Sequence, residues 1–288
     1  MTDDPHSHDL GFAHDLPRML GRRRFLTVLG GLGLGAAGGA QAMANVLTAL
    51  PWETQGPYPA DGTVTRGGTA QNVLTEAGVI RRDLRPSFGA LTPVAEGVQL
   101  DLDLRLANAA DGAPLDGHAI YVWHCDTVGD YSLYDIEDAN FLRGVGVADA
   151  DGRVSFTTIF PGCYDGRWPH IHFEVFESAE AAVSGAASVL TAQMAFPEAD
   201  CAAVYAADAR YPNGTRNLGR ITLSSDNVFA DNTAAQLTQQ TVALTGAPDT
   251  GYRGTLTIPV DFDAERSAGM APPAGGFPGG EMPPKPGE

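Results

Sequence analysis

Cysteines and basic residues are scarce in this sequence of 288 residues, and each shortage excludes a class of protein. Three cysteines cannot build a disulfide framework, so the hydrophobic core must stabilise the fold. There are 18 Lys and Arg against 35 Asp and Glu, which gives a formal net charge of −17. Nucleic acids and anionic membrane surfaces are therefore not expected as partners, because both are bound through Lys and Arg.

Two sequence patterns are also missing. The chain has no Gly-rich phosphate-binding loop and no regular alternation of strands and helices, which argues against a nucleotide-binding α/β fold. Its longest apolar stretch, in the first 42 residues, is shorter and richer in glycine than the roughly 20 apolar residues that span a bilayer.

Those first 42 residues have the order of a bacterial export signal. Three arginines at 22–24 precede an apolar stretch at 26–40, and an Ala-x-Ala site follows at 40–42. The Arg-Arg-x-Phe-Leu pattern resembles a twin-arginine signal. We therefore expect residues 1–42 to direct export through the twin-arginine machinery, to the periplasm or the cell exterior. An uncleaved N-terminal anchor is the alternative.

The rest of the chain is expected to form one domain, residues 45–263, followed by a disordered Pro/Gly-rich tail, residues 264–288. Alternating or β-branched patterns predict strands at 98–106, 119–124, 153–160, 170–176 and 255–262. Ala-rich stretches near 179–190 and 199–209 predict helices. We therefore predict a mainly β fold, a β-sandwich with short decorating helices.

The candidate functional residues begin with His170 and His172 in a predicted strand. Side chains at positions i and i+2 of a strand lie on the same face, roughly 6–7 Å apart, so both imidazoles can bind one metal ion. Two tyrosines lie upstream of this pair, each just after a glycine: Tyr131 follows Gly129 and Tyr164 follows Gly162. Phenolate oxygen is a hard anionic ligand that suits Fe(III), and only a highly charged ion offsets the cost of ionising a tyrosine at neutral pH.

Two segments carry a family resemblance. Residues 123–131 have the pattern WHCD-x-x-G-x-Y, and residues 161–173 have the pattern PG-x-Y-x-x-R-x-x-HIHF. Together they resemble the intradiol ring-cleavage dioxygenases, the catechol, hydroxyquinol and protocatechuate enzymes with non-haem Fe(III). The segments TQGPY at 54–58 and AQMAF at 192–196 resemble two further parts of this family. The resemblance covers residues 52 to about 262.

The resemblance implies a prealbumin-like sandwich and a role for each motif residue. Tyr131, Tyr164, His170 and His172 would be the protein ligands of Fe(III), with Tyr164 displaced when the substrate binds. Arg167 would offset negative charge on the aromatic ring, and Gln193 would form hydrogen bonds at the site. The substrates would be a small aromatic diol and O2, whose two atoms both enter a muconate-type diacid.

Several alternatives stay open at this stage. The link from Tyr164 to His170 is shorter than the family's, so the choice of catechol is not implied. An exported, non-catalytic β-sandwich binding module is the main rival function, and a zinc hydrolase using Glu174 is a third. The sequence allows a homo-oligomer, and it allows a disulfide between Cys163 and Cys201 in an oxidising compartment.

Two further histidines and the remaining aromatic residues carry no such role. We expect His118 and His124 to be structural or surface residues. Trp123 and the other tyrosines are expected in the core or at its rim.

Overall fold

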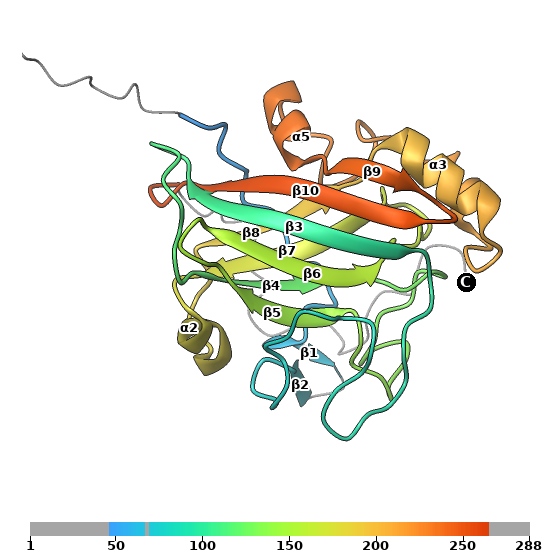
Figure 1. The fold of residues 1–288 in the computed structure, drawn as a ribbon. Coiled ribbons are helices and arrows are strands. Elements are labelled where there is room, and N and C mark those ends of the chain that lie inside the picture. The colour runs from blue at the N-terminus through green and yellow to red at the C-terminus, as the bar shows by residue number, and fades with distance from the viewer. Residues whose placement is uncertain (1–45, 67–68, 265–288) are drawn as a thin grey trace, which may run out of the picture. The chain divides into compact units, whose positions relative to one another are not determined.

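The computed structural model describes residues 46–66 and 69–264 (Figure 1). The proposed export signal, residues 1–42, lies outside the described residues, as does nearly all of the proposed tail. Among the described residues, no helix combines the length and the apolar character needed to cross a bilayer.

Two four-stranded sheets form the framework. In the first, β6 (Arg153–Ile159) pairs with β3 (Gln99–Asn108), which runs parallel to β10 (Gly251–Val260), and β9 (Ala243–Ala247) lies at the edge. In the second, the order is β5 (Arg143–Val147), β4 (Ala119–Trp123), β7 (His170–Phe176) and β8 (Leu190–Ala195), and all neighbours are antiparallel. A small ribbon pairs β1 (Asp61–Arg66) with β2 (Thr69–Asn72).

Short helices flank these sheets. They are α2 (Ala179–Ser184), α3 (Glu198–Ala207), α4 (Gly214–Leu218) and α5 (Ala234–Gln240). Figure 1 shows α2 beside β4 and β5, and α3 and α5 beside β9 and β10, as their contacts confirm. The mainly β sandwich with short helices, predicted from the sequence, is confirmed.

Both faces of the second sheet are covered. In β7, Ile171, Phe173 and Val175 pack into the core that the two sheets share. The alternate positions, His170, His172 and Glu174, are buried as well, under chain segments on the outer face of the sheet. A strand that is buried on both faces has no solvent-exposed side, so residues 170–176 do not show the usual alternation of apolar and solvent-exposed polar side chains.

Two local predictions need correction. The Ala-rich stretch 179–190 does not stay helical, because α2 ends at Ser184 and Gly185 caps it with a left-handed φ of 80°. Residues from 190 onward then form β8 against β7. The considered disulfide between Cys163 and Cys201 is not formed, and both cysteines are buried.

Candidate metal and catalytic site

The candidate site lies on the outer face of the second sheet, at the end where β4 stops and β7 starts. Trp123 pairs with His172 across the ladder, and His172 pairs with Gln193 of β8, so the three residues form one row on this face. The loop after β4 carries Tyr131 and the loop before β7 carries Tyr164. Antiparallel pairing brings these two loops to the same end of the sheet.

The two histidines face each other closely. Their Nε2 atoms are 3.1 Å apart, and the Tyr164 hydroxyl lies 3.3 Å from Nε2 of His170. His170 Nδ1 donates a hydrogen bond to the carbonyl of Trp168, which leaves the lone pair of the neutral ring on Nε2. The His172 ring stacks on the indole of Trp123, with centroids 5.0 Å apart and planes inclined by 6°.

Tyr131 completes the cluster. Its ring lies 6.1 Å from that of Tyr164 and 6.2 Å from that of His172, and it stacks on Tyr58 at 4.6 Å. Its hydroxyl is buried and has no hydrogen-bond partner within the described part of the chain, although the nearby Tyr164 hydroxyl influences its pKa. A buried hydroxyl without a partner is costly, and a bound cation would supply one.

A glycine shapes the contact between the two tyrosine-bearing loops. Gly129 has a φ of 100°, and a Cβ added there would lie 2.7 Å from Cβ of Tyr164. Asp126 holds this loop by accepting hydrogen bonds from the backbone N–H groups of Val128, Gly129 and Asp130. The Gly-x-Tyr spacing in the sequence therefore has a steric reason, because only glycine allows this approach.

Burial sets the protonation states at the site. Burial, and then the charge of Arg167, lowers the pKa of His170 to about 3, while burial and the neighbouring His170 lower the pKa of His172 well below its usual value. Burial raises the pKa of Tyr164 to about 12 and that of Tyr131 well above its ordinary value. Without a bound cation, the site therefore holds two neutral imidazoles and two protonated phenols.

These donors fit a ferric ion. The two Nε2 atoms are 3.1 Å apart, close enough for both to bind one ion at the usual metal–nitrogen distance of about 2.0–2.1 Å. Within residues 46–66 and 69–264, no three His, Cys, Asp or Glu side chains are grouped to hold a metal. The further oxygen donors beside the two nitrogens are the hydroxyls of Tyr164 and Tyr131, and phenolate oxygen suits a ferric ion.

Arg167 and Gln193 lie beside these donors and contact each other. Arg167 Nη2 donates to Oε1 of Gln193 at 2.6 Å, and Gln193 Nε2 donates to the carbonyl of Thr54 at 3.0 Å. The Gln193 amide thus contacts protein groups at both ends. Its geometry favours holding Arg167 over binding a substrate directly.

The histidines and glutamate outside the ligand set have structural partners. His124 is buried, donates from Nδ1 to the carbonyl of Cys125 and accepts at Nε2 from Thr158. His118 is half-buried and packs against Phe262. Glu174 shares the face of His172, as expected from its spacing, and accepts a hydrogen bond from Thr191.

Three residues near the site carry no sequence motif. Asp226 is fully buried and binds Arg167, Arg143 is fully buried and donates to the carbonyl of Ser132, and Glu53 accepts a hydrogen bond from the backbone N–H of Gln193. Contacts between residues far apart in the chain leave no periodic pattern in the sequence. Only the rarity of buried charges distinguishes these residues, and that is visible only in the structure.

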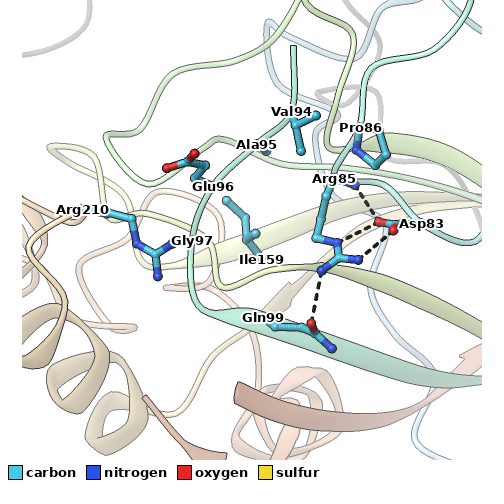
Figure 2. A pocket seen from close by; sticks show the side chains of 10 residues that line it. All are labelled: Asp83, Arg85, Pro86, Val94, Ala95, Glu96, Gly97, Gln99, Ile159 and Arg210. Atoms are coloured by element: carbon cyan, nitrogen blue, oxygen red, sulfur yellow. Dashed lines mark hydrogen bonds and ion pairs between the residues drawn. The ribbon is translucent and has the colours of Figure 1, made fainter. Parts of the chain in front are cut away.

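A surface cavity of about 460 Å³ lies elsewhere, and none of the residues discussed so far as site residues lines it (Figure 2). Figure 2 shows Arg85 between Asp83 and Gln99, to both of which it is hydrogen-bonded. Arg210, on the other side, is paired with Asp208. Both guanidinium groups of this cavity are thus already paired with neighbouring side chains.

Comparisons with known proteins agree with this fold. Residues 90–212 match the dioxygenase family model Dioxygenase_C. The intradiol ring-cleavage dioxygenase from Tetranychus urticae is similar in structure, with a TM-score of 0.56 and 21% identity over 76% of this chain and 98% of that one. The dioxygenase Tetur07g02040 gives a TM-score of 0.58 and 20% identity over 77% and 98%. No curated protein matches the sequence.

At such identities the solved structures establish the fold alone, which is that of the intradiol dioxygenases. The family match covers the segment that contains Tyr131, Tyr164, His170 and His172. The segment 90–212 matches the dioxygenase family and the described domain has the intradiol dioxygenase fold, so the resemblance inferred from the motifs is confirmed.

Proposed function

We propose that this protein is a non-haem Fe(III) dioxygenase that cleaves a catechol-type ring between its two hydroxyl-bearing carbons. It consumes one O2 and releases a muconate-type diacid. One observation carries the proposal: two imidazole nitrogens lie 3.1 Å apart, the Tyr164 hydroxyl lies 3.3 Å from that of His170, and the buried Tyr131 hydroxyl and the Arg167 guanidinium lie nearby. Tyr131, Tyr164, His170 and His172 would hold the ion.

The ferric ion, when bound, would act as a Lewis acid that activates the chelated diol toward O2. Tyr164 is half-buried, whereas Tyr131 is fully buried. Tyr164 is therefore the residue that can move away, and its phenolate oxygen would take a proton from one substrate hydroxyl. Arg167 keeps its proton and offsets the negative charge on the ring.

A visible spectrum of the iron-loaded protein tests this proposal. We expect a phenolate-to-iron charge-transfer band that shifts when catechol is added without oxygen, followed by ring cleavage when O2 is admitted. Tyr131→Phe and Tyr164→Phe should each weaken or shift the band. Tyr252→Phe, on β10 in the shared core, is the matched control and should leave it unchanged.

Product analysis separates the alternatives. Incorporation of both atoms of labelled O2 into a diacid supports intradiol cleavage, and oxygen uptake with catechol, hydroxyquinol and protocatechuate ranks the substrates. A protein that stays colourless after iron addition and consumes no O2 would contradict the proposal. It would leave the non-catalytic binding module as the working hypothesis.

We also propose export by the twin-arginine pathway. The support is the order of arginines, apolar stretch and Ala-x-Ala site within residues 1–42. The double change Arg22→Lys and Arg23→Lys should leave the protein in the cytoplasm, while wild type appears outside it with a shortened N-terminus. Equal export of both forms would contradict the assignment.

A further inference from the structure

Asp226 is a buried carboxylate that both family motifs leave out. It is fully buried, on the segment between α4 and α5, 59 residues from Arg167. Its Oδ1 accepts from the backbone N–H groups of Val228 and Phe229 at 2.9 and 3.2 Å. Its Oδ2 accepts from Arg167 Nε at 2.9 Å and from the backbone N–H of Trp168 at 2.7 Å. These four bonds hold the carboxylate in one orientation.

The same contacts fix the orientation of the Arg167 guanidinium. Nε is bound to Asp226 and Nη2 to Gln193 Oε1, so two of the three guanidinium nitrogens are fixed by protein groups. Nη1 has no hydrogen bond within the described part of the chain, and the side chain keeps 13% exposure. Because the guanidinium is planar, fixing two nitrogens also fixes the direction of the third.

Asp226 also reaches the candidate ligand His170 through one residue. It holds the backbone N–H of Trp168, and the carbonyl of Trp168 accepts from His170 Nδ1. A single carboxylate therefore restrains the arginine and the short link that carries the first histidine. Restraint of this kind keeps charged groups in place without reorganisation during a reaction.

We propose that Asp226 is a positioning residue, which holds Arg167 so that Nη1 faces the ring of the bound aromatic diol. This inference rests on the proposed function, because it assigns Arg167 a substrate to face. Its chemistry is specific: an anionic partner on Nε leaves the opposite end of the guanidinium for a second anion, the deprotonated diol. Asp226 acts only through Arg167 and Trp168 and touches no reacting atom.

The test is a double-mutant cycle on iron-loaded protein, with rates normalised to the charge-transfer absorbance so that unfolded or iron-free material is not counted. Asp226→Asn should lower kcat/KM by about 10- to 100-fold, as expected for a small displacement of a positioned group. In the background of Arg167→Met, the same change should add less than about 3-fold, because Asp226 then has no arginine to orient. Asp83→Asn removes the exposed partner of Arg85 and is the matched control.

Several outcomes would overturn the inference. One is an active wild type together with an Asp226→Asn variant of unchanged kcat/KM. Another is a loss of kcat/KM from Asp226→Asn that is as large in the Arg167→Met background as in wild type, because it would reveal a general structural role. If Asp226→Asn does not fold, Arg167→Lys replaces it: lysine keeps the charge but cannot bind Asp226 and Gln193 together. Wild-type kcat in that variant would refute the need for orientation. A wild type without ring cleavage refutes the proposed function, and this inference with it.

Discussion

Arg143 offers the sharpest test of how the site is held together. It is fully buried on β5, and its partners among the described residues are neutral oxygens. Nη1 donates to the carbonyls of Tyr58 and Pro59, and Nη2 donates to the carbonyl of Ser132. Arg143 therefore ties the segment carrying Tyr58 to the loop carrying Tyr131, and we consider the change Arg143→Met.

The magnitude follows from the acceptors that lose a donor. The Pro59 carbonyl keeps a hydrogen bond from Tyr121, so the carbonyls of Tyr58 and Ser132 lose the most. Leaving two buried carbonyls without this donor costs about 2–6 kcal/mol, and removing an unpaired buried charge returns part of that amount. We expect a net loss of about 2–4 kcal/mol in the free energy of unfolding.

Urea unfolding of the iron-free protein, followed by tryptophan fluorescence, measures this loss. With a slope of about 2 kcal/mol per molar urea, the midpoint should fall by about 1–2 M. Arg85→Met is the control, because Arg85 is 34% exposed and paired with the exposed Asp83, and its removal should cost less than about 1 kcal/mol. Equal losses in the two variants would refute the reasoning that buried donors to the Tyr58 and Ser132 carbonyls stabilise the site.

Three further predictions concern the loops and the buried titratable groups. Gly129→Ala should lower stability by about 1–2 kcal/mol and weaken the iron charge-transfer band, because the new Cβ meets Tyr164 and the φ of 100° is strained; an unchanged band would contradict this. Burial raises the pKa of Glu53 from 4.5 to about 7, so the folded state binds the extra proton and loses about 3 kcal/mol as the pH rises through that interval. Urea titrations of Glu53→Gln should show its stability rising relative to wild type over the same interval. Burial lowers the pKa of His124 to about 4, so the wild-type protein should lose about 3 kcal/mol of stability as the pH falls from about 6.5 to 4. The stability of His124→Gln should rise relative to wild type over that range. For Glu53 or His124, a stability difference between variant and wild type that does not change with pH would contradict the assignment.

The sequence predicts the shared core and the histidine pair because both depend on local pattern. The alternation in β3 and the His-x-His spacing in β7 follow from the two-residue period of a strand, and the structure contains both. Strand β5 was missed because Arg-Gly-Val-Gly-Val has little strand propensity. Pairing with β4 imposes it, and a Cβ at Gly146 would lie 2.3 Å from Val154 of the facing sheet.

The network behind the site could not be predicted, for a different reason. Asp226, Glu53 and Arg143 act through contacts with residues far away in the chain. No spacing rule links such positions, since each contact depends on how the irregular segments cross the sheet. The motif residues could be named because their segments resemble those of a known family and because the histidine pair has the spacing of a strand. Their supports belong to segments whose position only the folded structure defines.

Burial of the two histidines and two tyrosines bears on which ion the proposed site would hold. The low dielectric that keeps His170 and His172 neutral leaves their lone pairs free for a metal. The same burial makes Tyr131 and Tyr164 difficult to ionise, so an ion that gains only from the imidazoles would leave both phenols protonated. A trivalent ion interacts with phenolate strongly enough to offset that cost. In the proposed function, the half-buried Tyr164 would be the oxygen donor that an incoming diol replaces, and the fully buried Tyr131 would keep the ion in place.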